Sequence, residues 1–436
     1  MKTSLSSDEL QLVIKSDLVL RVGKICLAAG TGSYRIKQSM RHVATMLGIE
    51  NQTHVTLTEI NATCRSGQLF KTEVITIQSV GINTSKIQQI ENLLITLQQK
   101  HHKMQDSELI RYLDHALYQI EKQPPLYSLH QTALFAAIAC TSFTFLIGGG
   151  LIEMLGVFIA SVLGQTIRSQ LLKRNLNQFV VTMLAAAGAS CLYLLFINIC
   201  HYFLQINIEH AAGYIASMLF LIPGFPLITG ILDMAKLDFS SGIQRVIYAI
   251  TVIFCATFAA WVVAAGMHIT PAPMLTPEIF PVYTFIFRLI ASFFGVLGFS
   301  LLFNSPLKTA LCAAFIGMVA NTIRLEMIDF TNIPIQAAAL IAAFFVGISA
   351  FYFSNRKHCP RIALSVPAVC IMVPGIYMFR AMYFLQQNNI INSINWGAQA
   401  MLIVLALPMG LVLARVCTDK EWAFNQLPTN NKSHSK

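Results

Sequence analysis

The chain has 436 residues, of which 55% are hydrophobic and only 11% are charged. A soluble globular domain usually carries about 25% charged residues, so this composition excludes a chain that is soluble throughout. The net charge of +10 does not indicate nucleic-acid binding, because the sequence has no basic run interleaved with aromatic residues, and excess Lys and Arg also gather in the cytoplasmic loops of membrane proteins.

The charged residues are concentrated near the N-terminus, since 25 of the 50 lie in residues 1–128. The pair Pro124-Pro125 marks the end of this segment, because helices tend to stop before proline. The start of the chain is polar, without the short apolar segment of a signal peptide, so we expect this segment to stay in the cytoplasm. We predict a cytoplasmic α+β domain over 1–128, membrane halves over 129–268 and 278–418, and a cytoplasmic tail over 419–436.

Within the N-terminal domain the pattern predicts helices over 7–29, 33–47, 84–100 and 105–122, and strands over 53–60 and 71–79. The run from Thr53 to Thr58 alternates as a half-buried strand does, and Thr84 is a plausible helix N-cap. The domain has no catalytic triad order, metal-ligand spacing or phosphate-binding loop. The ten cysteines are scattered without a CxxC and are interpreted as buried thiols. We therefore expect that the chain binds neither a cofactor nor a metal and is not an enzyme.

The rest of the chain contains ten apolar segments of about the length that crosses a membrane. They cover 131–148, 150–167, 178–203, 211–232, 245–266, 281–303, 306–323, 333–354, 362–385 and 396–416. With the N-terminal domain inside, the inner loops carry almost all the Lys and Arg, and the outer loops carry only Arg324. This asymmetry follows the positive-inside rule and predicts that both termini are cytoplasmic.

Two pairs of motifs suggest an internal repeat. Gln165-Thr-Ile-Arg168 ends the second segment and Asn321-Thr-Ile-Arg324 ends the seventh, while Pro223-Gly224 interrupts the fourth and Pro374-Gly375 the ninth; the offsets are 156 and 151 residues. Halves of five helices each must insert with opposite orientation, as in many secondary transporters. The predicted fold is an α-helical polytopic membrane protein of about ten transmembrane helices in two inverted five-helix repeats.

The two Pro-Gly interruptions are the first candidates for a substrate site. Proline removes a backbone donor and glycine allows close approach, so a broken helix exposes backbone groups that can hold a ligand. The alternative for Pro223-Gly224 and for Pro374-Gly375 is a packing kink.

Arginine inside a membrane segment is costly and indicates function by default. Arg380 follows Pro374 by six residues, about 9 Å along a helix, and could bind a substrate carboxylate through its guanidinium. The alternative is an ion pair with an internal acid such as Asp233 or Glu153. Arg288, in the sixth segment, is a second candidate.

Asp233 is the first candidate for proton coupling, because a partly buried carboxylate can titrate near neutral pH. The alternative is a salt bridge at the helix end with Lys236. Glu153 is the second candidate for coupling.

Four uncharged polar residues on membrane segments could bind a zwitterion: Gln165, Thr229, Asn321 and Thr322. Hydrogen bonds between packed helices are the alternative explanation for all four.

Two stretches resemble the threonine/serine exporter family of bacteria and fungi. One runs from Leu20-Arg21-Val22-Gly23 to Tyr34-Arg35-Ile36 and Leu47-Gly48-Ile49; the other is Pro223-Gly224-Phe225-Pro226-Leu227 with Asp233 and Ser241-Gly242-Ile243-Gln244-Arg245 downstream. Lys37 departs from the family, where many relatives carry an acidic residue two positions after the arginine of Tyr-Arg. The likeness covers nearly the whole chain, which looks like a fused form of the two membrane halves.

The resemblance implies proton-driven export of small hydroxy amino acids across a bacterial inner membrane. Some relatives with separate halves are associated with dicarboxylate export, so succinate is an alternative substrate. A membrane sensor with a cytoplasmic ligand-binding domain is the alternative from another class, and a membrane enzyme is a third. The expected partners are a small amino or carboxylic acid, protons and the bilayer, without nucleic acid; the sequence leaves a homo-oligomer open.

Overall fold

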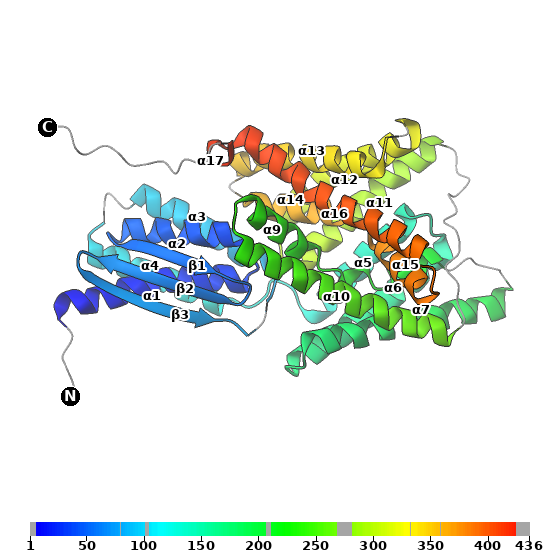
Figure 1. The fold of residues 1–436 in the computed structure, drawn as a ribbon, viewed down its shortest axis with the longest axis horizontal. Coiled ribbons are helices and arrows are strands. Elements are labelled where there is room, and N and C mark those ends of the chain that lie inside the picture. The colour runs from blue at the N-terminus through cyan, green and yellow to red at the C-terminus, as the bar shows by residue number, and fades with distance from the viewer. Residues whose placement is uncertain are drawn as a thin grey trace.

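The computed structural model describes residues 6–78, 80–100, 104–205, 211–267, 281–331, 333–357 and 359–423. Figure 1 shows three strands and the first helices at one end of the molecule and the remaining helices at the other. We call residues 6–122 the N-terminal region and residues 129–418 the helical body. Residues 268–280, where the first predicted membrane half ends and the second begins, and the predicted tail beyond residue 423 lie outside the described residues.

The described residues of the N-terminal region form four helices and three strands. They are α1 (Ser7–Ala28), α2 (Ser33–Met46), β1 (Glu50–Val55), β2 (Glu59–Ser66), β3 (Leu69–Thr76), α3 (Thr84–Lys100) and α4 (Asp106–Lys122). The strands form an antiparallel sheet in the order β1-β2-β3. Alternate residues of β2 are buried and join a core with all four helices, separate from the core of the helical body.

The predicted strand over 53–60 is wrong, because the chain turns inside it. The amide of Thr56 donates to the carbonyl of Glu59 at 2.9 Å, which closes a turn between β1 and β2. Thr56, Leu57 and Thr58 all favour strands and include neither Gly nor Pro, so the residue pattern hid the turn. The predicted strand over 71–79 is a strand that starts at Leu69 and ends at Thr76.

Asn83, rather than the predicted Thr84, caps helix α3. The Asn83 side chain accepts from the amide of Lys86 at 3.1 Å. Thr84 is the first helical residue, and its hydroxyl donates to the carbonyl of Phe303 at 3.2 Å in the helical body.

Within the described ranges, the helical body has eight helices that are long and apolar enough to span a membrane, or up to ten spans if each of two bent pairs counts as one. The eight are α5 (Leu129–Leu146), α6 (Leu151–Lys173), α7 (Gln178–Leu204), α10 (Phe239–Gly266), α11 (Pro281–Leu302), α12 (Leu307–Thr331), α13 (Ile335–Lys357) and α16 (Ile390–Thr418). The bent pairs join α8 (Ala211–Ala216) and the short η2 (Leu219–Leu221) to α9 (Gly224–Ala235), and α14 (Arg361–Cys370) to α15 (Gly375–Gln386). A short α17 (Lys420–Ala423) follows.

The ten predicted apolar segments coincide with these helices, but several ends differ. The helix predicted over 306–323 continues to Thr331, and those predicted to start at 245 and 396 start at Phe239 and Ile390. The added turns contain polar residues, so hydrophobicity alone made these three predicted helices too short.

Both bent spans break at the predicted Pro-Gly pairs, and the two breaks have the same geometry. Pro223 has φ −81° and ψ 58°, and Pro374 has φ −82° and ψ 57°. In each break the glycine amide donates to the carbonyl two residues earlier, at 2.9 Å from Gly224 to Ile222 and from Gly375 to Val373. These are inverse γ-turns, after which the chain bends by 63° and 47°.

The N-terminal region attaches to the loop between α11 and α12. The amides of Thr84 and Ser85 donate to the carbonyls of Phe303 and Asn304 at 3.0 and 3.2 Å. Asn304 has a positive φ of 60°, which turns its side chain amide to donate to Asn83 at 2.9 Å. The first turn of α3 is therefore fixed by the helical body.

Candidate functional site

The two helix breaks pack against each other. A Cβ atom built on Gly224 would lie 2.8 Å from the sulfur of Cys370, and one built on Gly375 would lie 2.7 Å from a methyl group of Leu219. A larger residue at either glycine would force these side chains of the opposite span to shift. The predicted substrate residues Pro223, Gly224, Pro374 and Gly375 thus meet at one place in the helical body.

The space between the breaks is small and apolar. It measures about 10 Å³, enough for roughly one water molecule. Its lining comes from both bent spans and from α5 and α11: Phe143, Leu219, Ile222, Gly224, Phe299, Phe303, Cys370 and Val373. The breaks are therefore closed on each other in this conformation, and a substrate of several heavy atoms would fit only after they separate.

Among the predicted polar residues, Thr229 and Gln165 lie near the first break. The Thr229 hydroxyl donates to the carbonyls of Phe225 and Pro226 in its own helix, at 3.0 and 3.2 Å. Gln165 follows Gly164, which packs on Phe220 of η2. Its amide nitrogen donates to Ser169 at 3.4 Å, whereas its buried carbonyl oxygen has no hydrogen-bond partner in the described part of the chain.

On α12, Asn321 orients an arginine that has no acidic partner among the described residues. The Asn321 amide donates to Ser292 at 2.8 Å, and its oxygen accepts from Nε of Arg324 at 3.1 Å. Arg324 makes no ion pair with any residue that the structure describes. The next residue on from Asn321, Thr322, has a buried hydroxyl with no described hydrogen-bond partner.

Arg380 and Tyr377 lie beside Trp396, one to two turns after the second break. The Arg380 guanidinium lies over the Trp396 ring at 4.7 Å, and the Tyr377 ring is 5.3 Å from the same ring. Tyr377 lies within electrostatic reach of both Arg324 and Arg380. We call Asn321, Arg324, Tyr377, Arg380 and Trp396 the arginine cluster; it can hold an anion against aromatic walls.

Arg288, the second predicted carboxylate ligand, is engaged with acids of the protein. Its guanidinium contacts Glu326 at 2.9 Å and Asp329 at 2.6 Å, both on α12. Because two carboxylates already neutralise it, Arg288 fixes α11 to α12 and is less suited than Arg324 to bind a substrate.

Glu153 is buried in the first turn of α6, where it links three segments. One carboxylate oxygen accepts from the amide of Gly150 at 2.9 Å, and the other accepts from the amide of Gly213 at 3.0 Å and the hydroxyl of Tyr193 at 3.4 Å. The carboxylate therefore caps its own helix and ties α7 and α8 to it.

Asp233 is fully buried where the N-terminal region meets the helical body. Its Oδ2 accepts from the amide of Ser33, at the start of α2, at 3.0 Å and lies 3.4 Å from Nε of Arg245. Its Oδ1 has no hydrogen-bond partner within the described ranges. Asp233 thus caps a helix of the N-terminal region, and its cationic neighbour is Arg245 rather than the predicted Lys236.

Arg245 binds the same turn of the N-terminal region. Its guanidinium donates to the carbonyls of Gly30 and Thr31 at 3.3 and 2.8 Å, and its Nε donates to Ser241 at 3.1 Å. Gly32 has no room for a side chain, because an added Cβ would lie 2.8 Å from Asp233. The turn therefore requires a residue without a side chain at Gly32 to fit against α9.

A second set of contacts surrounds the junction, by which we mean the contact of residues 30–33 with α9 and α10. Lys37, where the sequence departs from the family pattern, forms an ion pair with Asp238 at 2.7 Å. The hydroxyl of Tyr34 accepts from Arg415 of α16, and its ring meets the Trp422 ring edge to face at 5.4 Å. Trp422 also lies under Lys236 at 4.5 Å, so α17 closes over the junction.

Arg35 holds α2 to α3 inside the N-terminal region through an ion pair with Glu91. Burial would lower the pKa of Arg35, but the neighbouring Glu91 and Tyr34 outweigh burial and raise it. Its charge is therefore fixed, in agreement with a structural role.

Comparison with known families decides which family the chain belongs to. The family model ThrE, of threonine/serine exporters, matches residues 17–267, more than half of the chain. The chain belongs to the threonine/serine exporter family. A second model of these exporters, ThrE_2, matches residues 288–417.

Two relatives of the chain are named for different substrates. The chain is 24% identical to the threonine/serine exporter of Corynebacterium glutamicum, over 97% of this chain and 84% of that protein. It is 28% identical to the probable succinate transporter subunit YjjP of Escherichia coli K12, over 38% of this chain and 60% of that protein. No solved structure matches it.

The family assignment and the apolar helices together make the chain a multi-pass membrane transporter. Two arginines of the site were not among the sequence-predicted site residues. Arg245 entered only as the last residue of a motif, although an arginine at the start of a predicted membrane segment is costly to bury and was a signal. Arg324 entered only as the end of a repeated motif and as the one basic residue of the predicted outer loops, a position at odds with the positive-inside rule and for that reason informative.

Proposed function

We propose that the chain is a secondary exporter of small hydroxy amino acids, threonine and serine, driven by protons. The observation that carries this proposal is the reciprocal packing of the two helix breaks. Gly224 packs on Cys370 and Val373, and Gly375 packs on Leu219 and Ile222. Subtracting the repeat offset of 151 from Cys370 and Val373 returns Leu219 and Ile222, so each break contacts the same two positions of the other half.

This exchange of contacts is what a two-fold axis between two inverted repeats produces. Transporters of this construction bind substrate where the broken helices meet, and alternate by moving one repeat against the other. We therefore assign the substrate path to the space between the breaks, which must open to admit a ligand. The two halves would extend over 129–268 and 278–418, with the N-terminal region and both termini in the cytoplasm of a bacterial inner membrane.

In this proposal Arg324 binds the substrate carboxylate. It lies in the arginine cluster next to the second break, held by Asn321 through Nε, which leaves both terminal nitrogens for a bidentate contact. Arg380 and Trp396 form the other wall of the cluster. The orphan oxygen of Gln165 near the first break is an acceptor for the ammonium group.

Asp233 remains our first candidate for proton coupling, with Glu153 second. Protonation of Asp233 would weaken its contacts to Arg245 and to the amide of Ser33, so it would loosen the N-terminal region from α9. We expect Asp233→Asn to abolish proton-coupled export while protein is still produced in the membrane. Unchanged export by this variant would remove Asp233 from the mechanism.

The test of the exporter proposal is efflux from bacteria that produce the chain and are loaded with a threonine dipeptide. We expect external threonine to appear faster than in cells without the chain, and a protonophore to stop it. Gly224→Leu should stop export because its side chain would occupy the space between the breaks and keep them from closing, which alternation requires, whereas Gly266→Leu, at a position with open space around it, should export normally. Equal efflux from all strains would refute the proposal.

Succinate is the second candidate substrate. The 28% identical relative named as a probable succinate transporter subunit supports it, as do two guanidinium groups within one cluster, which suit a ligand with two carboxylates. Parallel loading with succinate separates the candidates: export of succinate without threonine would replace the first with the second.

A further inference from the structure

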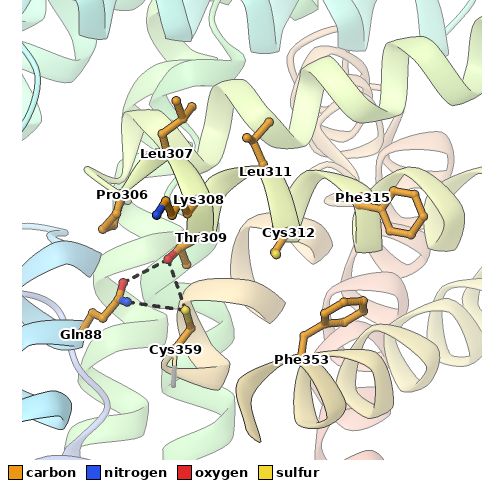
Figure 2. Close-up of a pocket in the computed structure, with 10 residues that line it drawn as sticks. All are labelled: Gln88, Pro306, Leu307, Lys308, Thr309, Leu311, Cys312, Phe315, Phe353 and Cys359. Atoms are coloured by element: carbon orange, nitrogen blue, oxygen red, sulfur yellow. Dashed lines mark hydrogen bonds between the residues drawn. The ribbon is translucent and has the colours of Figure 1, made fainter. Parts of the chain in front are cut away.

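A second cavity, of about 1000 Å³, lies beside α12 at the end of the helical body that meets the N-terminal region. Figure 2 shows its lining: Gln88 from α3, the first turns of α12, Phe353 from α13 and Cys359 before α14. None of its lining residues belongs to the space between the breaks. It is therefore a separate site.

One wall of this cavity is an apolar strip on the outside of α12. Leu307, Leu311 and Phe315 follow at four-residue intervals on one face and are 57%, 42% and 53% exposed. The strip runs about 12 Å along the helix, close to the roughly 15 Å depth of one leaflet of the hydrocarbon core. Because α12 spans the membrane, this face meets lipid chains rather than water.

The other end of the cavity is polar and carries one cation. The hydroxyl of Thr309 donates to Gln88 at 3.1 Å, and the Gln88 amide donates to the sulfur of Cys359 at 3.5 Å, so these groups already satisfy one another (Figure 2). Lys308 is exposed and makes no ion pair with any residue in the described ranges. A cation in the first turn of a helix is unfavourable unless an anion is near it.

We propose that this cavity binds an anionic phospholipid, with its phosphate at Lys308 and an acyl chain along Leu311 and Phe315. The lining contains no acidic residue to repel the phosphate. Basic pockets beside membrane helices take such headgroups. An amino acid would leave the apolar strip uncovered, and a soluble protein would not reach a face inside the bilayer. The inference rests on the membrane span of α12 and is independent of the exported substrate.

The bound lipid would also bridge the two parts of the molecule. Gln88 belongs to the N-terminal region and Lys308 to the helical body, and the lipid phosphate would lie where they meet. The bound lipid would therefore help to hold α3 against the helical body.

The experiment is native mass spectrometry of the purified full chain with phosphatidylglycerol or phosphatidylcholine of identical acyl chains. We expect the chain to retain phosphatidylglycerol preferentially. Lys308→Gln should weaken that binding about fivefold, the share of one lysine near a membrane surface, and Lys308→Arg should preserve it. Lys173→Gln removes an exposed basic residue of α6 outside the cavity and should leave binding unchanged.

A second variant, which fills the cavity, tests whether an acyl chain lies along Leu311 and Phe315. Cys312→Trp should lower phosphatidylglycerol binding further than Lys308→Gln does. Equal loss in Lys308→Gln and Lys173→Gln would show general surface attraction and overturn the proposal. So would displacement of bound phosphatidylglycerol by threonine at transport concentrations, which would make the cavity a substrate vestibule.

Discussion

The contact between Asp233 and Arg245 offers a quantitative test of how the N-terminal region is held. The side chains are 0% and 2% exposed, so removing either charge leaves the other buried without compensation. Such a loss costs about 3–5 kcal/mol. Asp233→Asn keeps an oxygen to accept from the Ser33 amide, and Arg245→Met keeps the volume, so each substitution removes mainly charge.

The double variant should lose much less free energy of stabilisation than the two single variants lose together. It leaves no unpaired charge, and its main loss is the two donors to the carbonyls of Gly30 and Thr31, about 1 kcal/mol each. We therefore expect the double variant to lose about 2–3 kcal/mol of stability, which corresponds to a coupling energy between the two side chains of at least about 3 kcal/mol.

Hydrogen exchange of the peptide over residues 29–36 measures these losses of stability locally, because it reports the free energy of opening the turn rather than of unfolding the whole protein. Arg288→Met is the matched control, since it breaks ion pairs between α11 and α12 and should leave the peptide protected. Additive single effects, or unchanged exchange in the single variants, would refute the reasoning.

Three further predictions concern other parts of the molecule. Arg324→Gln should raise the KM of export about tenfold or more, as the loss of a charge-assisted contact does, whereas Arg288→Gln should change yield but not KM; equal KM values would exclude Arg324 from binding. Trp422→Ala removes an edge-to-face contact with Tyr34 and cation contacts worth about 0.5–1 kcal/mol each, so limited proteolysis near residue 32 should quicken; unchanged cleavage would contradict the role of α17. Gly410→Ala should lower the melting temperature, because its Cβ would lie 2.4 Å from the carbonyl of Leu340, while Gly266→Ala should not.

The membrane architecture could be predicted because the bilayer imposes it. A span needs a run of apolar residues, and the same composition rule located the eight long helices and the two bent pairs. The breaks at Pro223 and Pro374 were also predictable, since proline cannot continue the backbone ladder and both motifs occur in the same order. That the breaks close on an apolar space depends on side chains from both halves, which no local pattern reveals.

The junction could not be predicted from the sequence, because its partners lie far apart in the chain. Asp233 and Ser33 are separated by 200 positions, and nearby Lys236 was the reasonable local partner. Lys37 looked like a departure from the family, yet its ion pair with Asp238 gives it a function within this chain. Arg324 stood out through a repeated motif and its predicted location, and only the structure shows that none of the described acids pairs with it.

The central claim, export through the paired breaks, is tested most directly with the purified chain in proteoliposomes that contain labelled threonine. An imposed proton gradient should drive threonine across the membrane, Gly266→Leu should behave as the unmodified chain, and Gly224→Leu should lose transport while retaining its fold. Transport of threonine that is equal in Gly224→Leu and in the unmodified chain would contradict the account.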